Sequence, residues 1–235
     1  MEKINIMNKT IIVSGGTKGI GKAIINKFYN EGYSVYTCSR SAENLANLKS
    51  EFPKISTFVA DLSRKDEVFK FAEFVKSSTD TIDVLVNNTG LFVPGQIHTE
   101  EDGTLESQIN TNLYSAYNLS RALLPLMITK QKGDVFNMCS TASITPYING
   151  GSYCISKYAL YGMTKVLREE MKEHNIRVTA ILPGATYTSS WEGVDIPEER
   201  FMPSSDVAES IWSAHQLTSR SVIEEILIRP QLGDL

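Results

Sequence analysis

Tyrosine and lysine stand four residues apart in the stretch SYCISKYAL, which otherwise has the pattern of a buried helix. That spacing places Tyr153 and Lys157 on one helix face. The same face continues through Leu160, Thr164, Leu167 and Met171. A lysine on such a face is costly unless its ammonium has polar partners or lies in a wet cleft. A phenol beside an ammonium has its pKa lowered from about 10, which suits an acid or base near neutral pH.

A polar residue also interrupts the apolar stripe of the helical segment from Thr104. The predicted inward positions are Leu105, Ile109, Asn112, Ala116, Leu119 and Leu123. A buried asparagine must be satisfied by neighbouring backbone groups or by a bound water. The stripe alone favours a structural role for Asn112.

Glycines mark the turn between the first predicted strand and the first predicted helix. At Gly15, Gly19 and Gly21 they permit a tight turn and let backbone N–H groups approach a pyrophosphate at the helix N-terminus. The spacing is G-x-x-x-G-x-G rather than the more common G-x-G-x-x-G, and close packing of the turn is the alternative explanation.

The end of the second predicted strand bears on the choice of nucleotide. Domains that bind NAD usually place an acidic residue there to hold the ribose 2′-hydroxyl, but this chain has Cys38, Ser39 and Arg40. A guanidinium suits a 2′-phosphate, and Lys18 in the glycine-rich turn adds a second positive charge. Solvated surface cations are the alternative. Because no acid stands between them, the pair favours NADP(H).

Short β-branched runs alternate with helical patterns along the whole chain, which indicates an α/β fold with a parallel sheet covered on both faces. Seven strands are predicted to begin at Thr10, Ser34, Ser56, Val84, Asp134, Arg177 and Glu224. Helices are predicted at 19–30, 42–50, 65–77, 104–130, 152–174 and 205–217. No repeat or linker divides the chain, so we expect one domain over residues 1–235. Right-handed crossovers make it a doubly wound, Rossmann-like sheet of strand order 3-2-1-4-5-6-7.

In such sheets ligands bind at the carboxyl ends of the strands. The segments that follow the first six predicted strands are SGGTKGIG, SRS, DLS, NNTG, CSTAS and PGATYT. These polar segments are therefore expected to form the site.

The composition limits the kinds of partner. Hydrophobic residues make up 42% of the chain and charged residues 21%, which is enough apolar surface for a sizeable core. A net charge of -4 argues against a nucleic acid or an anionic membrane as partner. No apolar run reaches the roughly 18 to 20 residues of a membrane helix, so we expect a cytoplasmic protein. The three cysteines and three histidines lack metal-ligand spacing, and no metal site is expected.

Six motifs together carry a family resemblance. SGGTKGIG, NNTG, Asn112, Ser140, YCISK and PGATYT, in this order and spacing, resemble the short-chain dehydrogenase/reductase family, and in particular its NADP(H)-preferring members. The resemblance runs from about Thr10 to Thr188 and continues as a terminal strand. Two departures, Ser14 for the leading threonine of the glycine motif and Thr89 for the alanine of NNAG, change hydrogen bonding at the nucleotide.

The resemblance implies four catalytic roles. Tyr153 would protonate a carbonyl oxygen as hydride arrives, and act as the base in reverse. Lys157 would lower the pKa of Tyr153 and bond the nicotinamide ribose. Ser140 would steady the substrate oxygen, and Asn112 would hold a water that links Lys157 to solvent.

It also implies a cofactor site spread over the strand ends. The glycine-rich turn would take the pyrophosphate, the end of the third strand the adenine, the NNTG segment the wall beside the cofactor, and Thr188 the carboxamide end. Besides Tyr153 and Lys157, the implied cofactor-binding residues are Gly15, Thr17, Lys18, Gly19, Ile20, Gly21, Ser39, Arg40, Asp61, Leu62, Asn87, Asn88, Gly90, Pro183, Gly184 and Thr188.

The irregular segment at about 184–203 is predicted to cover the cleft as a lid. Together with facing loops it would form a mainly apolar pocket for a small or medium carbonyl compound. The expected pocket residues are Leu91, Phe92, Tyr147, Trp191, Phe201 and Met202. The alternative is that some of them merely pin the lid to the body.

A second apolar stripe on the helix at 152–173 needs cover as well. It comprises Ile155, Ala159, Met163 and Val166. We therefore predict a symmetric homodimer or homotetramer built on this helix and on that at 104–131, as is usual in the family.

The leading hypothesis is an NADPH-dependent carbonyl reductase acting on a small molecule. A 3-oxoacyl-[acyl-carrier-protein] reductase is the alternative among enzymes, and a basic docking patch near the cleft would distinguish it. Such a patch could come from Arg121, Lys130, Lys132, Arg168 and Lys172, which equally suit solvated helix faces. A non-catalytic dinucleotide sensor is the alternative of another class, and it would have no need of Tyr153.

Overall fold

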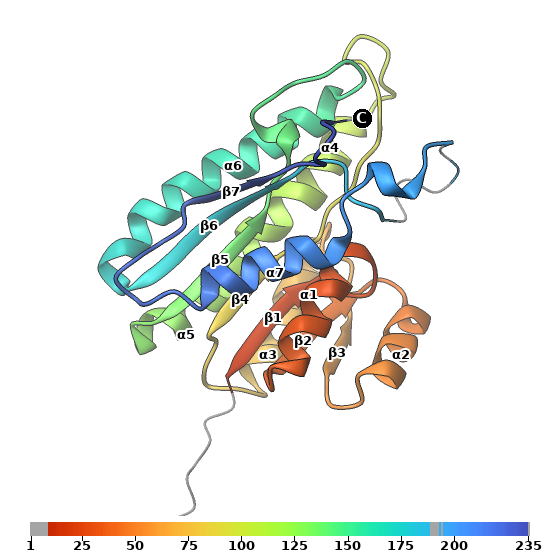
Figure 1. The fold of residues 1–235 in the computed structure, drawn as a ribbon. Helices are drawn as coiled ribbons and strands as arrows, with labels where there is room; N and C mark the ends of the chain where they lie inside the picture. The colour runs from red at the N-terminus through yellow and green to blue at the C-terminus, as the bar shows by residue number, and fades with distance from the viewer. Residues whose placement is uncertain (1–8, 189–192, 194, 235) are drawn as a thin grey trace, which may run out of the picture.

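Seven parallel strands form one sheet in the computed structural model, which describes residues 9–188, 193 and 195–234. The strands are β1 Thr10–Ser14, β2 Ser34–Ser39, β3 Ser56–Val59, β4 Val84–Asn87, β5 Gly133–Met138, β6 Ile176–Pro183 and β7 Glu225–Ile228. Their order is β3-β2-β1-β4-β5-β6-β7 (Figure 1), which confirms the predicted doubly wound topology.

Helices cover both faces of this sheet. They are α1 Gly19–Asn30, α2 Ala42–Glu51, α3 Lys65–Lys76, α4 Thr104–Ile109, α5 Ser115–Lys130, α6 Gly151–Met171 and α7 Ser204–His215. Shorter turns are the π-helical η1 Asn110–Tyr114 and the 3-10 turns η2 Thr141–Ser143, η3 Lys172–His174 and η5 Glu198–Arg200. Within the described residues no helix is both long and apolar enough to cross a membrane.

Alternate residues of each strand face opposite helix layers. In β1, Ile12 packs with α3 and α5, whereas Ile11 and Val13 pack with α1 and α7, which lie side by side in Figure 1. All three side chains are fully buried. Burial on both faces explains why the central strands β1 and β4, TIIVS and VLVN, are nearly continuous apolar runs rather than alternating ones.

The helical segment from Thr104 to Lys130 is not one regular α-helix. Between α4 and α5, η1 has π-helical hydrogen bonding, which adds a residue to one turn. The inward face of α4 is therefore rotated relative to that of α5. The prediction that Leu105 points inward is wrong, since that side chain is 40% exposed. Gln108 is buried in its place, while Asn112 is buried as predicted.

A buried polar cluster joins several elements at the amino ends of the strands. Asp134, at the start of β5, accepts hydrogen bonds from Nε and Nη2 of Arg177 on β6, the second at 2.8 Å. Its Oδ2 lies 2.5 Å from Nδ1 of His215, whose Nε2 lies 2.6 Å from the Tyr33 hydroxyl. Arg177 also donates to carbonyl groups at and after the end of α7. The cluster therefore fastens α7 to the sheet.

Replacing Asp134 with alanine is expected to lower the free energy of unfolding by about 3–5 kcal/mol, because it leaves the mostly buried guanidinium of Arg177 without its carboxylate. Urea denaturation followed by circular dichroism measures this. Asp66→Ala removes an exposed ion pair with Lys70 and serves as the control, with little expected effect. Equal stability losses in the two variants would contradict the role assigned to the cluster.

Candidate active site

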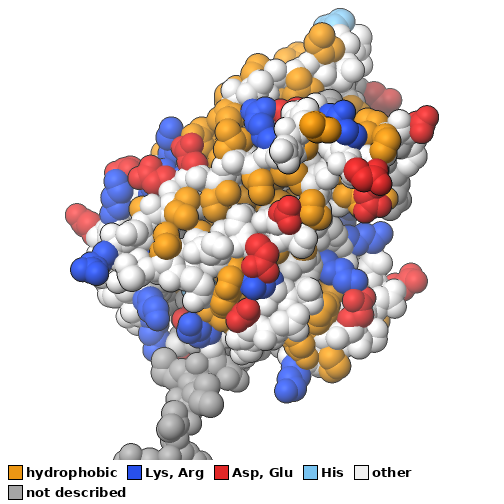
Figure 2. Space-filling view, in the orientation of Figure 1, with side chains coloured by type: hydrophobic (Ala, Val, Ile, Leu, Met, Phe, Trp, Pro, Cys, Tyr) orange, Lys and Arg blue, Asp and Glu red, His pale blue; other side chains and the backbone are white. Residues whose placement is uncertain are grey.

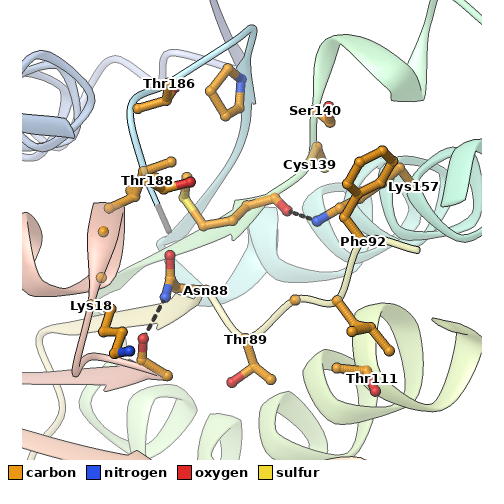
Figure 3. Close-up of a pocket in the computed structure, with 18 of the residues that line it drawn as sticks. Lys18, Asn88, Thr89, Phe92, Thr111, Cys139, Ser140, Lys157, Thr186 and Thr188 are labelled. Carbon is orange, nitrogen blue, oxygen red and sulfur yellow. Dashed lines mark hydrogen bonds between the residues drawn. The ribbon is translucent and has the colours of Figure 1, made fainter. Parts of the chain in front are cut away.

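A cavity of about 780 Å³ lies at the carboxyl edge of the sheet. It is lined by the segments that follow β1 to β6, as expected from the strand-end rule, and by one residue near the C-terminus. Figure 3 shows lining side chains from these separate loops turned toward a common space.

Most of the predicted cofactor residues line this cavity. They are Gly15, Thr17, Lys18, Gly19, Ile20, Gly21, Ser39, Arg40, Asp61, Leu62, Asn88, Gly90, Tyr153, Lys157, Pro183, Gly184 and Thr188. Asn87 is placed elsewhere. Its side chain is buried at the end of β4, where it donates to Ser120 Oγ at 2.9 Å and Asn137 Oδ1 at 2.7 Å.

The glycine-rich turn requires glycine at the predicted positions. Gly15 and Gly19 have φ of +67° and +50°, which disfavours residues with a Cβ. A Cβ on Gly21 would lie 2.5 Å from Asn88 Nδ2 and 2.5 Å from the Gly15 carbonyl oxygen. Asn88 Nδ2 in turn donates to the Ser14 and Gly15 carbonyls at 3.0 and 2.9 Å. The loop after β4 thus holds the turn in shape.

The start of α1 is suited to an anion. Its first turn has no acidic residue and no side-chain cap, so N–H groups at the positive end of the helix dipole face the cavity edge. The Thr89 hydroxyl lies beside Gly15 of the glycine-rich turn, buried and without a hydrogen-bond partner among the described residues. An open cradle of N–H groups with an unused hydroxyl fits the phosphate and ribose groups of a dinucleotide.

The end of the cavity next to β1 and β2 carries two cations. Lys18 and Arg40 both line it, and both are exposed. Neither forms an ion pair with another part of the chain that the structure describes. Their charges are therefore available to a phosphate group.

At the other end of the cavity, Lys157 is nearly buried, at 5% exposure. Its Nζ donates to the Met138 carbonyl at 2.7 Å and lies 5.7 Å from the centre of the Tyr153 ring. Burial lowers the pKa of Lys157 to about 8. The Met138 carbonyl and the cavity thus provide the polar or solvated environment expected for this lysine.

The pKa of Tyr153 departs from the sequence-based expectation. Burial raises it to about 12, although a hydrogen bond with Ser140 acts in the opposite direction. Desolvation therefore outweighs the Ser140 hydrogen bond, and the phenol keeps its proton at neutral pH. Ser140 itself is fixed at the start of η2, where its Oγ accepts from Ala142 N at 3.1 Å.

Asn112 does not line the cavity but supports the loop that does. Its Oδ1 accepts from Leu91 N at 2.7 Å, and its Nδ2 donates to the Leu91 carbonyl at 2.9 Å and to Ser156 Oγ at 2.8 Å. Gln108, one turn earlier, binds Val93 N and O in the same manner at 3.3 and 3.2 Å. Sequence reasoning missed Gln108 because the π turn that buries it was not predicted.

Three of the predicted pocket residues line the cavity, namely Leu91, Phe92 and Tyr147. The Phe92 ring meets the Tyr153 ring edge-on, with centres 4.8 Å apart. Phe201 and Met202 are buried and do not line the cavity, and a β-bridge joins Met202 to Thr186, so the alternative that they pin the segment to the body holds for them. Trp191 lies outside the described residues.

Several lining residues were not predicted, and one of them comes from a distant part of the chain. Asp234 reaches the cavity beside Gly184, at 2.8 Å from where a Cβ on that glycine would lie, and pairs with Arg229. It follows the carboxyl end of β7, so extending the strand-end rule to the seventh strand would have found it.

Basic residues considered for a docking patch do not gather at the cleft. Lys132, Arg168 and Lys172 line a separate cavity of about 510 Å³ at the amino ends of β5 and β6. From Lys157 to Lys172 the helix runs about 22 Å at 1.5 Å per residue. Within one chain, these three cations are therefore at the opposite edge of the sheet from Tyr153.

The chain is similar to known proteins over nearly its whole length. The short chain dehydrogenase family matches residues 9–198. A sepiapterin reductase of Chlorobaculum tepidum is 31% identical over 243 residues, covering 97% of this chain and 99% of the relative. A 3-oxoacyl-[acyl-carrier-protein] reductase of Thermotoga maritima is 32% identical over 202 residues, covering 83% and 80%. The crystal structure of a metagenomic short-chain oxidoreductase in complex with NADP superposes with a TM-score of 0.83 at 30% identity, covering 95% and 97%.

The lowered pKa of Lys157 predicts a pH-dependent stability. The folded pKa is about 8 and the ordinary value 10.5, so the unfolded chain binds more protons between these values and stability rises with pH there. The free energy of unfolding of the wild type relative to Lys157→Met should therefore increase by about 1–2 kcal/mol between about pH 8 and pH 9.5. Urea titrations without cofactor measure this, and parallel pH curves would contradict it.

Proposed function

The chain belongs to the short-chain dehydrogenase family, and from this premise we propose that it reduces a small carbonyl compound to an alcohol with NADPH. The observation that carries the proposal is the placement of Tyr153, Lys157 and Ser140 at one end of a cavity whose other end bears Lys18 and Arg40. A non-catalytic dinucleotide sensor would have no need of the first three residues.

The proposed chemistry divides between cofactor and protein. NADPH, when bound, supplies the hydride, and the remaining work falls to side chains. Ser140 donates a hydrogen bond to the substrate oxygen, and Tyr153 transfers its phenolic proton to that oxygen as the carbonyl carbon is reduced. A phenol with a pKa raised to about 12 by burial is held in the protonated form that this direction requires.

Lys157 and Asn112 prepare the acid for the next turnover. The Lys157 ammonium lies one helical turn from Tyr153, where its positive charge stabilises the phenolate that forms when Tyr153 gives up its proton. We propose that it also bonds the nicotinamide ribose. Asn112 holds Leu91 and Ser156 in place, and we assign it the neighbouring water through which Lys157 exchanges protons with solvent.

NADP(H) is the proposed cofactor because the free cations lie at the adenosine end of the cavity. Arg40 immediately follows β2, where an acid would bind the ribose 2′-hydroxyl of NAD. A guanidinium and an ammonium instead match a 2′-phosphate. The NADP complex of the metagenomic relative, at 30% identity, supports the same choice.

The substrate is proposed to be a compact, partly aromatic carbonyl compound. Phe92 and Tyr147 give the cavity an aromatic wall beside Tyr153. The Chlorobaculum relative bears the name sepiapterin reductase, which makes pteridines the first class to test. The Thermotoga relative keeps acyl thioesters in the panel, although Lys132, Arg168 and Lys172 lie at the far edge of the sheet.

We also propose a symmetric homodimer or homotetramer through the helices at 104–131 and 152–173. Tyr117 on α5 and Ile155 and Val166 on α6 are exposed by 45%, 41% and 59%. Figure 2 shows hydrophobic side chains along the surface where Figure 1 places α6 and β7, and Leu227 on β7 is 51% exposed. An apolar face of this kind is typical of an interface.

Removal of the proposed acid gives the first test. Tyr153→Phe is expected to lower kcat/KM by about 10²- to 10⁴-fold in an NADPH absorbance assay with ketones, quinones, sugars, pteridines and acyl thioesters. Tyr158→Phe, which changes an exposed tyrosine of the same helix, is the matched control and should keep full activity. Equal rates for wild type and Tyr153→Phe would refute the proton-donor role.

Cofactor selection is tested at Arg40. Arg40→Ala is expected to raise the Kd for NADPH about 10- to 100-fold by removing charge-assisted bonds to the 2′-phosphate, and to leave the Kd for NADH nearly unchanged. Fluorescence titration measures both constants. Arg220→Ala removes an exposed arginine from the far edge of the sheet and should change neither. A wild type that prefers NADH would overturn the assignment of Arg40.

Light scattering at micromolar concentration tests the assembly. The wild type is expected to have the mass of a dimer or tetramer, and Val166→Glu to shift it to a smaller species by placing a charge in the apolar interface. Val59→Glu, at a similarly exposed valine of β3, is the matched control and should not change the mass. A monomeric wild type would contradict the proposal.

A further inference from the structure

Helix α6 begins without a cap of its own. Its N-cap is Gly150, which has no side chain to accept a hydrogen bond from the first turn. Tyr153 belongs to that first turn, so the position of its phenol depends on how firmly the start of the helix is held. Uncapped N–H groups leave a helix end prone to fraying.

A carboxylate from another loop supplies the missing acceptor. Glu100, before α4, accepts from Ser152 N through Oε1 at 2.8 Å and from Ser152 Oγ through Oε2. Ser152 is almost completely buried and directly precedes Tyr153. The negative charge also lies at the positive end of the α6 dipole, where it is stabilising.

Two glycines make room for this carboxylate. A Cβ on Gly151 would lie 2.1 Å from Glu100 Oε1, and one on Gly95 would lie 2.7 Å from Glu100 Cγ. Neither glycine has the positive φ that would otherwise demand glycine. Close approach of the Glu100 side chain is therefore a steric reason for glycine at both positions, and at Gly151 the Gly95 carbonyl oxygen, 2.6 Å from the same Cβ position, is a second.

The same loop is attached to the start of α6 at further points. Gly95 N donates to the Asn149 carbonyl at 2.9 Å, and Gln96 Nε2 donates to Asn149 Oδ1 at 2.9 Å. Glu100 N donates to the Gln96 carbonyl at 2.9 Å, which places the carboxylate at the end of a tight turn. Segments 95–100 and 149–152 thus form one bonded unit beside the cavity.

The backbone of Tyr153 is consequently held on both sides. Glu100 fixes the preceding residue, Ser152. On the following side, Ser156 Oγ donates to the Tyr153 carbonyl at 2.8 Å and accepts from Asn112 Nδ2 at 2.8 Å. Phe92, whose ring contacts that of Tyr153, lies in the loop that Asn112 binds and that also carries Glu100.

We propose that Glu100 is a positioning residue for the Tyr153 phenol, acting as an N-cap of α6 supplied by a different loop. The proposal rests on the proposed reductase function, since the group it positions is the acid of that reaction. Because the carboxylate contacts Ser152 and not the cavity, its loss should affect the chemical step more than cofactor binding.

The test compares three variants with wild type in the NADPH assay and by fluorescence titration of NADPH. Glu100→Ala is expected to lower kcat by up to about 100-fold, since a small displacement of the acid is enough, with KM and the Kd for NADPH changed less than about threefold. Glu100→Gln keeps an acceptor for Ser152 N and should recover kcat to within about fivefold of wild type. Glu101→Ala, an exposed acid of the same loop, should behave as wild type.

Hydrogen exchange read by mass spectrometry separates this proposal from the reductase function. Glu100→Ala should speed exchange in the peptide spanning 149–156 and leave β1 and β5 unchanged, whether or not a substrate has been found. Unchanged exchange there, or a kcat loss that Glu100→Gln does not recover, would overturn the positioning role. A parallel loss of NADPH binding would do the same, because it would indicate general disruption of the fold.

Discussion

The hydrogen bond from the Lys157 amine to the Met138 carbonyl ties α6 to the carboxyl end of β5. Met138 is the last residue of its strand, and the chain then turns, with Cys139 N bonded to the Asn137 carbonyl. A buried amine needs such an acceptor, because an unpaired one would carry the full cost of desolvation. The bond therefore fixes the position of α6 along its own axis relative to the carboxyl edge of the sheet. Tyr153, one turn before Lys157, acquires its place over the cavity from the same contact.

The two edges of the sheet meet different demands. At the amino edge, Asp134, Arg177 and His215 saturate one another and join strands to α7. At the carboxyl edge the helix N-terminus of α1, the Thr89 hydroxyl and the cations Lys18 and Arg40 keep unused bonding capacity. The amino edge thus stabilises the fold through paired groups, and the carboxyl edge leaves polar groups for a ligand. This division is usual in open parallel sheets.

Much of the fold and of the lining could be predicted because both follow from local patterns. Strand runs, helical stripes and the glycines of the turn are each encoded within a dozen residues, and the strand-end rule converts them into a site. What escaped prediction depends on contacts between distant segments. The π turn, near which Gln108 rather than Leu105 is buried, accompanies hydrogen bonds that join Gln108 and Asn112 to the loop at 91–93. Asp234 reaches the cavity from beyond β7.

The direction of the Tyr153 pKa escaped prediction for a related reason. A sequence shows that an amine is near a phenol, but it does not show how much water the fold removes from that phenol. Here burial prevails and raises the pKa to about 12. Phe201 and Met202 illustrate the same limit, since the sequence does not reveal whether an apolar residue of an irregular segment faces a cavity or the body.

The paired amides of Gln108 and Asn112 have a consequence for how this scaffold can change. They bind the backbone of Val93 and Leu91 as a neighbouring strand would, so the path of the chain at Phe92 does not depend on the side chain there. Residue 92 can be replaced without moving the wall that carries it. Under the proposed function, its position against the Tyr153 ring makes it a site where single substitutions would change the substrate range while the catalytic framework stays intact.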